Sequence, residues 1–371
     1  MKVYELPVIG TYVLYLLIVI LAPLCLRNLS ETKSNKAKWF MTWLILTIPA
    51  ALRYMTGRDW PLYEDAYNVI IKSGNFLSAS YNIENSFKFL SYISNKLTGS
   101  SVILFGAYAA LSNLFALIGI YRFKDHVSCS WSVFIYSALT YFTMYNISRQ
   151  FLAIMIVFAG YREILDRKFF KYLIWVALAS LFHATAVLTL VLYVYGWATN
   201  SGNRYRQLVN FALYILPVVG ILMINEVMPV VSKLLNNAKY DSYEVGSIES
   251  IGLGAVVQLA TGAGIYFGLS QKQIDVGYKS FCLRTYVLAL VLFMLQYAMA
   301  NYGGRVYLYF IPVQILLIGS VMKGMELRVS TGRLKATLPQ LFLLGFTLLQ
   351  LVHSMITNAQ KHVPYSFRLP W

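Results

Sequence analysis

Charged residues are scarce in this chain: Asp, Glu, Lys and Arg together make up 12% of its 371 residues, whereas a soluble domain carries about 25%. That shortage argues against a soluble globular protein. Acidic residues are fewer than basic ones: the chain has 15 Asp and Glu against 31 Lys and Arg, so the formal net charge is +16. No basic stretch interleaved with aromatic residues stands outside the hydrophobic runs, and we therefore expect no nucleic-acid partner.

Cysteine and the usual catalytic signatures are also nearly missing. The three cysteines, Cys25, Cys129 and Cys282, form no CxxC pair, which argues against a disulfide framework and against a zinc ribbon. The sequence contains no metal-ligand spacing, P-loop, G-x-S-x-G motif or dinucleotide fingerprint. We therefore assign the chain neither a metal nor a cofactor.

Long hydrophobic runs are what the sequence has instead. Hydrophobic residues make up 58% of the chain, and runs of about 20 residues match the thickness of a bilayer core. Because only helices and closed barrels satisfy the backbone in lipid, we predict an all-α polytopic membrane protein with a single integral domain, residues 1–371. We expect about twelve spans, at residues 8–26, 39–53, 101–121, 128–145, 148–164, 169–182, 184–197, 208–225, 251–270, 281–300, 306–322 and 337–357. The two short spans within 169–197 are alternatively one long helix.

The distribution of Lys and Arg sets the expected orientation, because short cytoplasmic loops carry an excess of both. With both termini outside, nineteen of the 31 basic residues fall in short inner segments. Treating 169–197 as one span would mix basic and non-basic loops on each face, so we prefer two spans. Residues 54–100 and 226–250 then form external loops. Within the first of them, amphipathic residues 86–98 are expected either to lie on the membrane surface or to pack on the bundle.

The segment RYMTGRDWPLYEDAY, residues 53–67, carries much of the unusual charge. It holds two arginines, three carboxylates and a glycine, and it follows the second expected span on the outer side. Asp59 directly precedes a Trp-Pro pair, a pattern typical of a helix start. Asp59 is therefore either an N-cap or a general base that takes a proton from a substrate hydroxyl, kept ionised by Arg58.

Two further arginines open expected helices on the outer side. Arg149 begins one span, and Arg305 begins another after two glycines. A cation at a helix N-terminus is disfavoured, but an anion held between the arginine and the free N–H groups removes that conflict. The planar fork of arginine suits phosphate. Together with Arg53 and Arg58, these residues predict a phosphate or pyrophosphate site; the alternative is that each arginine reaches to lipid headgroups.

A histidine and several aromatic residues complete the expected site. His183 lies between the two short spans, where it is either a packing residue or a substrate hydrogen bonder and alternative base. Broken helices at membrane depth are tolerated chiefly where they line a cavity. Most of the 29 tyrosines and seven tryptophans belong to interfacial belts. A smaller group near the site is expected to stack on the rings of a ligand: Trp60, Tyr63, Tyr302 and Tyr365.

Four segments of the chain, taken in order, resemble the EpsG-like family of bacterial polysaccharide polymerases, a branch of the Wzy-type enzymes. They are RYMTGRDWPLYEDAY, SRQFLAIMIVF, ASLFHATAVL and HVPYSF. They match a series of Arg, Gly, Asp and Tyr in that order, an Arg-Gln pair that opens a span, a histidine after a short span, and the C-terminal segment. One departure is Trp60, where the family more often has Tyr or another aromatic residue. Within these motifs, the residues that match the family are Arg53, Gly57, Asp59, Tyr63, Arg149, Gln150 and His183.

The resemblance implies a GT-C-like glycosyltransferase of the bacterial inner membrane. Such an enzyme uses undecaprenyl-pyrophosphate-linked oligosaccharide as both donor and acceptor on the periplasmic face, and makes O-antigen for lipopolysaccharide, capsule or exopolysaccharide. The arginines, with Gln150, Tyr63 and Tyr302, would bind the pyrophosphate or the substrate, and Asp59 or His183 would be the base. We expect an inverting, metal-independent transfer, and a chain-length regulator and a flippase as possible partners.

Two other functions remain open from the sequence. A ligase that moves finished glycan from the same lipid carrier to another acceptor would use similar chemistry. A lipid-linked glycan flippase or secondary transporter would need ionisable residues near mid-bilayer and often internal repeats. The chain has its unusual charges at one face and no evident repeat, so we favour the polymerase.

Overall fold

The computed structural model describes residues 2–27, 35–75, 81–200, 253–295, 305–328 and 333–368, and four single positions between 211 and 219. Helices predominate among these residues, with only four short strands beside them. The helices in the first half are α1 (Val8–Cys25), α2 (Asn35–Leu52), α3 (Trp60–Lys72), α4 (Asn85–Thr98), α5 (Val102–Arg122), α6 (Cys129–Ile135), η1 (Tyr136–Thr140) and η2 (Tyr141–Tyr145). The others are α7 (Ser148–Leu165), α8 (Phe169–Ser180), η3 (Ala184–Thr189), α9 (Leu190–Asn200), α12 (Leu253–Ser270), α13 (Val276–Leu295), η6 (Tyr307–Tyr309), α14 (Val313–Met322) and α15 (Leu338–Thr357).

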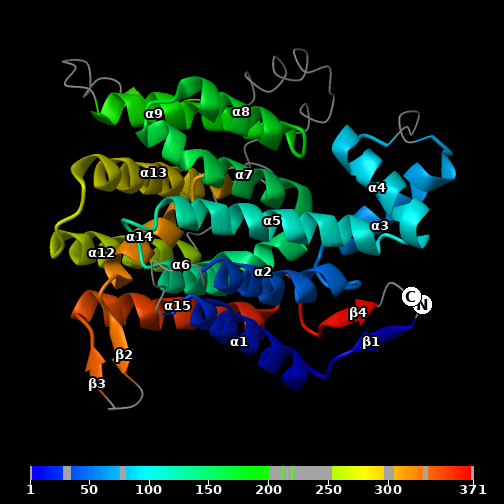
Figure 1. Ribbon diagram of the computed structural model, residues 1–371, viewed down its shortest axis with the longest axis horizontal. Coiled ribbons are helices and arrows are strands. Elements are labelled where there is room, and N and C mark those ends of the chain that lie inside the picture. Colours follow the sequence, from blue (N-terminus) through cyan, green and yellow to red (C-terminus); the bar gives the residue numbers. More distant parts are fainter. Residues whose placement is uncertain are drawn as a thin grey trace.

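The long helices lie roughly along the longest axis of the molecule (Figure 1). Four of those in the described residues are long and apolar enough to cross a membrane: α1, α5, α13 and α15. Large apolar side chains such as Ile9 and Ile356, 77% and 70% exposed, lie on the surface of α1 and α15. A surface of this kind fits lipid rather than water. The all-α polytopic membrane fold is therefore confirmed, while the count of twelve spans stays a prediction.

The expected spans correspond closely to helices. A helical segment occupies the described part of every expected span, although most of 208–225 lies outside the described residues, as does the external loop 226–250. The span expected at 281–300 begins earlier, because α13 starts at Val276. Residues 169–197 form two helical segments, since α8 ends at Ser180 and η3 begins at Ala184. The interpretation of that region as one long helix is therefore wrong.

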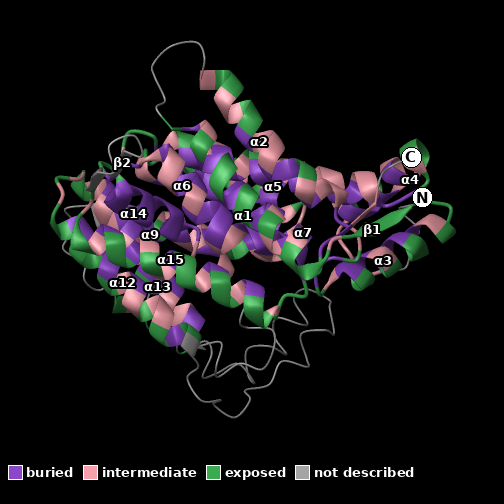
Figure 2. Ribbon diagram, turned by 90° about the horizontal axis from the view of Figure 1, so that it is seen from below, coloured by how far each residue is buried: buried purple, intermediate pink, exposed green. Residues whose placement is uncertain are grey.

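Helix α7 lies in the middle of the bundle and is buried along almost its whole length. Buried residues gather toward the middle of the bundle, and exposed residues lie along outer helices such as α12 (Figure 2). Close approach of α5 to α7 depends on Gly119, where an added Cβ would overlap the ring of Phe158. Because tight packing fixes α7, the residues of its first turn, Arg149 and Gln150, start from a rigid platform.

The two ends of the chain meet in a short sheet that the sequence did not predict. Strand β1 (Val3–Glu5) pairs antiparallel with β4 (Ser366–Arg368), next to α3 and α4 (Figure 1). A second pair, β2 (Glu326–Arg328) with β3 (Arg333–Lys335), lies at the opposite end. Three-residue strands are too short to show a period of two in the sequence. Both termini therefore lie at the end that carries α3 and α4, which we call the α3–α4 end.

Helix α4 occupies the segment expected to be interfacial. It packs against α3 and α5 and buries Phe87, Ser91 and Ser94, whereas Phe89 and Leu97 are 50% and 66% exposed. The packing alternative is thus confirmed for one face of the helix. Contact of the other face with lipid remains a prediction.

Candidate functional site

The loop before α3 is held tightly at the α3–α4 end. Gly57 has a φ of +110°, and an added Cβ would overlap the backbone carbonyl of Tyr145. The N–H groups of Gly57 and Arg58 donate to the carbonyls of Lys361 and Gln360, at 2.8 and 3.0 Å. Glycine alone combines this backbone conformation with so close an approach. The loop is thereby fixed between η2 and the C-terminal segment.

Replacing Gly57 by alanine is expected to lower the thermal unfolding midpoint of the detergent-solubilised protein. The positive φ contributes strain of about 1–3 kcal/mol, and the overlap with the Tyr145 carbonyl adds to it. Gly74→Ala is the matched control, because Gly74 also has a positive φ, +72°, but open space around it. Equal falls in the midpoint for the two variants would show that the close approach at Gly57 is unimportant.

Asp59 stands directly before α3, yet its side chain makes no capping hydrogen bond. Asp59 thus occupies the predicted N-cap position, and its backbone carbonyl accepts the N–H of Tyr63 at 3.2 Å, but its carboxylate does not cap the helix. One of its oxygens, Oδ2, lies 3.6 Å from Nη2 of Arg305 instead. The Asp59 side chain is 19% exposed and that of Arg305 is 52% exposed, so the pair opens to the surface. The structure thus brings these two predicted site residues together from distant parts of the chain.

Glu84 is the centre of a second group of contacts, and the sequence analysis missed it. Its Oε1 lies 2.9 Å from Nδ1 of His183, and its Oε2 accepts a hydrogen bond from Nη1 of Arg149. All three side chains are partly open, with exposures of 18%, 25% and 20%. The sequence did hold a signal, because Glu84 is the single carboxylate between Asp65 and Asp125.

The surroundings of Glu84 favour its ionised form. Burial alone would raise the pKa of the carboxyl. The hydrogen bond with His183 and the positive charge of Arg149 outweigh burial, so the pKa lies below its usual value. Glu84 is therefore a carboxylate at neutral pH, with one oxygen for each partner.

Aromatic rings support Arg149. Its guanidinium lies over the rings of Tyr63 and Phe87, 5.6 and 5.9 Å from their centroids, a favourable arrangement for a cation. Tyr63 itself is 5% exposed, and Trp60 and Tyr365 are 1% and 4% exposed. In this structure, three of the four rings expected to stack on a ligand are thus covered by protein. The fourth, Tyr302, lies outside the described residues, as do the two glycines before Arg305.

Gln150 connects the two groups of contacts. Its Nε2 donates to the backbone carbonyl of Arg305 at 3.0 Å, and the side chain is 5% exposed. Because Gln150 and Arg149 are neighbours at the start of α7, this bond places Arg305 and Asp59 beside Arg149 and Glu84. Gln150 therefore positions Arg305, a role that the sequence did not predict.

Arg53 lies in the interior and not at the open surface. It is 2% exposed, donates to the Ala50 carbonyl and to Oγ of Ser148, the latter at 2.9 Å, and stacks over Tyr145. In contrast, Arg58 is exposed. Three of the four expected arginines, Arg58, Arg149 and Arg305, thus reach the surface of the α3–α4 end. Arg53 fixes the end of α2 against the start of α7.

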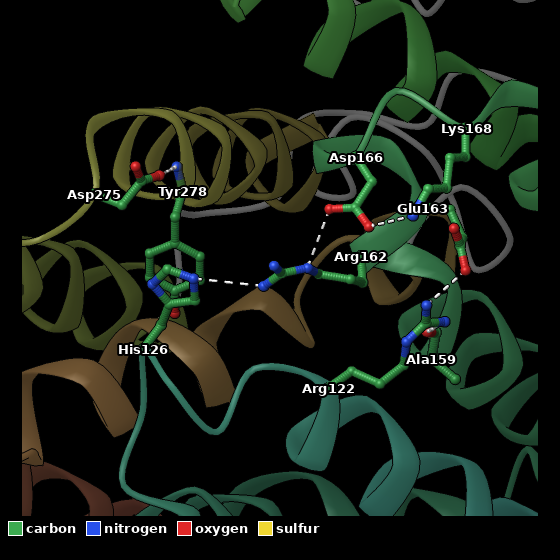
Figure 3. Close-up of polar contacts among 9 residues, drawn as sticks. All are labelled: Arg122, His126, Ala159, Arg162, Glu163, Asp166, Lys168, Asp275 and Tyr278. Atoms are coloured by element: carbon green, nitrogen blue, oxygen red, sulfur yellow. Dashed lines mark hydrogen bonds and ion pairs between the residues drawn. The ribbon is translucent and has the colours of Figure 1, made fainter.

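A separate polar cluster lies at the other end of α7 (Figure 3). Arg122 pairs with Glu163 at 2.5 Å, and Arg162 pairs with Asp166 at 3.2 Å and lies 3.5 Å from the ring of His126. These charges pair with one another and hold α5, α7 and the following loop together. Among the residues that the structure describes, no group of three or more His, Cys, Asp or Glu could hold a metal ion.

Comparison with known proteins supports one family. The model of the EpsG family matches residues 36–367, a range that includes every member of both groups of contacts at the α3–α4 end. Searches of curated proteins and of solved structures found no match. The match covers nearly the whole chain, and the helices are those of a multi-pass membrane protein. The chain therefore belongs to the EpsG family, a Wzy-like family of polysaccharide polymerases.

Proposed function

We propose that the protein is a membrane glycosyltransferase that polymerises undecaprenyl-pyrophosphate-linked oligosaccharide repeat units. One observation carries the proposal: two partly exposed arginines, a histidine and two carboxylates converge at one end of an apolar helical bundle. They are Arg149, Arg305, His183, Asp59 and Glu84. This combination can bind a diphosphate and also accept a proton, as glycosyl transfer from a lipid pyrophosphate requires.

The arginines form the donor side of the proposed reaction. Arg305 is about half exposed and Arg149 keeps an accessible portion, while Arg58 is exposed in the loop before α3. Charge-assisted hydrogen bonds from guanidinium groups are strong toward phosphate. As the bond between the sugar and the pyrophosphate breaks, negative charge develops on the leaving group, and prearranged positive charge stabilises it. We propose that this stabilisation allows the transfer to proceed without a metal ion.

The acceptor side requires a base for the hydroxyl of the incoming glycan. Asp59 and His183 are the two candidates: Asp59 lies 3.6 Å from Arg305, and His183 shares Glu84 with Arg149. A single displacement with such a base inverts the anomeric carbon and needs no covalent intermediate. We propose this inverting course on a GT-C-like arrangement of helices.

We place the reaction on the periplasmic face of the bacterial inner membrane. The cluster at the far end of α7 includes Arg122, Arg162 and Lys168, and an excess of basic residues is typical of the cytoplasmic side. The α3–α4 end, with both termini, would then face the periplasm. The product would be O-antigen, capsule or exopolysaccharide, made together with a flippase and a chain-length regulator of the same pathway.

Purified protein reconstituted in liposomes is expected to extend lipid-linked glycan. Lipid extracts from a strain that lacks the gene would supply single repeat units on their carrier. A ladder of longer glycans on that carrier is the expected product, separated by gel electrophoresis, with heat-treated protein as the control. Without a length regulator, we expect no preferred chain length in the ladder.

Two outcomes would contradict the polymerase. Transfer of glycan to a different acceptor without lengthening would identify a ligase, and the deletion strain would then accumulate long unattached glycan on its carrier. Movement of the lipid-linked unit across the bilayer, with no change in length, would identify a transporter.

A further inference from the structure

We propose that Glu84 is a positioning residue that makes His183, and not Asp59, the general base of the transfer. The inference rests on the proposed function and goes further, because it decides between the two candidate bases. It also adds a residue that neither the motifs nor the family match had singled out.

A hydrogen bond joins the side chains of Glu84 and His183. Glu84 Oε1 lies 2.9 Å from Nδ1 of His183, and a carboxylate can only accept. Since Glu84 is ionised, the neutral imidazole must carry its proton on Nδ1. The lone pair then lies on Nε2, the nitrogen that faces away from Glu84. A neutral histidine held in this tautomer is ready to take a proton from a hydroxyl.

Neighbouring hydrogen bonds hold the segments that carry Glu84 and His183. Glu84 precedes α4, and its carbonyl accepts the N–H groups of Phe87 and Lys88 at 3.0 and 3.3 Å. Ser86 Oγ donates to the carbonyl of Leu181 at 2.5 Å. This bond joins the start of α4 to the end of α8, two residues from Glu84 and two from His183. The hydrogen bond between Glu84 and His183 therefore lies beside a second hydrogen bond that joins the same two segments.

The second carboxylate oxygen of Glu84 holds Arg149. One carboxylate thus holds two groups side by side: the base, and an arginine that binds pyrophosphate. In the transfer, the acceptor hydroxyl gives its proton to Nε2 of His183 as its oxygen forms the new bond to the anomeric carbon. The bond from that carbon to the pyrophosphate oxygen breaks, and the pyrophosphate leaves with the electron pair toward Arg149. Asp59 instead lies beside Arg305, which suits a role in placing that arginine.

Glu84→Gln is the informative variant, because an amide has one oxygen where the carboxylate has two. The guanidinium of Arg149 needs that oxygen, so the NH₂ group is left facing Nδ1 of His183. Nδ1 must then accept, and the proton moves to Nε2, which removes the lone pair from the substrate side. We expect a fall in kcat of about 100-fold, at the lower end of what a general base contributes, with KM nearly unchanged.

The tautomer can be measured directly with ¹³C,¹⁵N-histidine labelling and NMR in detergent micelles. The chain has 4 histidines, so His183→Ala identifies the His183 signals by subtraction. We expect the Nδ1–H form in the wild type and the Nε2–H form in Glu84→Gln. Glu64→Gln is the matched control, since Glu64 accepts a hydrogen bond from Ser101 at the same end but has no histidine partner.

Kinetics in the liposome assay separate positioning from general stability. If Glu84 acts through His183, the double variant Glu84→Gln/His183→Ala extends glycan no more slowly than His183→Ala alone. If the two substitutions multiply each other's effect on the rate of extension, Glu84 does not act through His183. An unchanged tautomer in Glu84→Gln would overturn the role of Glu84 in the same way, even if the wild type polymerises. A wild-type protein that extends no glycan would instead overturn the proposed function, whatever the histidine spectra show.

Discussion

His183→Ala is expected to lower the rate of glycan extension by about 10²–10⁴-fold, the range that a positioned general base contributes. The variant keeps Arg149, Arg305 and Glu84, so donor binding and KM should change little. The measurement is the initial rate of lipid-linked glycan extension in liposomes, over a range of donor concentrations. His353→Ala is the control, because His353 is exposed on α15 and the proposed mechanism gives it no role.

Asp59→Asn tests the competing assignment of the base. We expect a smaller fall in kcat and a higher KM for the donor, because the loss of the carboxylate releases Arg305. If Asp59 is the base, the order reverses: Asp59→Asn abolishes turnover and His183→Ala keeps most of it. Unfolding midpoints of both variants, measured beside the kinetics, exclude loss of structure as the cause.

The helices could be predicted from the sequence because lipid imposes a simple rule. A run of apolar residues must satisfy its own backbone hydrogen bonds, so composition and length locate helices such as α1 and α5 within a few residues. The break near His183 could be predicted from the distribution of Lys and Arg. With one long span there, basic and non-basic loops would be mixed on each face of the membrane. The pairing of β1 with β4 could not, because it joins three-residue segments from opposite ends of the chain.

The outward cluster could be predicted in part for a similar reason. Charge in an apolar chain carries a large desolvation penalty, so Asp59, Arg149 and Arg305 stood out as residues that need partners. The identity of those partners is a matter of distant contacts, which spacing along the chain does not record. Glu84 shows this most clearly: it precedes an ordinary amphipathic helix, and its role depends on the ends of α7 and α8 beside it.

Arg53 illustrates the opposite error, in which a motif residue was expected at the surface. Its guanidinium is instead surrounded by the rings of Trp60, Phe105 and Tyr145. Aromatic faces and backbone carbonyls stabilise a buried guanidinium, and the sequence does not show that the rings of Phe105 and Tyr145 join that of nearby Trp60 around it. A residue can therefore belong to the motif because it supports the site from within.

Arg149→Lys is expected to reduce glycan extension by about 10²–10³-fold, the effect of removing one preorganised donor from a developing anion. Lysine keeps the positive charge but has a compact ammonium in place of the planar fork. It cannot hold Glu84 with one edge while the other reaches a phosphate oxygen. Both KM for the lipid-linked donor and kcat should therefore worsen, as measured by initial rates in the liposome assay.

Arg162→Lys is the matched control, because Arg162 lies on the same helix at the far end and pairs with the partly exposed Asp166. A surface pair of this kind contributes about 1 kcal/mol or less, so this variant should polymerise like the wild type. Wild-type chain length and rate in Arg149→Lys would remove the argument for a pyrophosphate site at the start of α7. If Arg149→Lys instead loses activity while Arg162→Lys keeps it, the fork of Arg149, and not charge on α7 in general, is what the reaction needs.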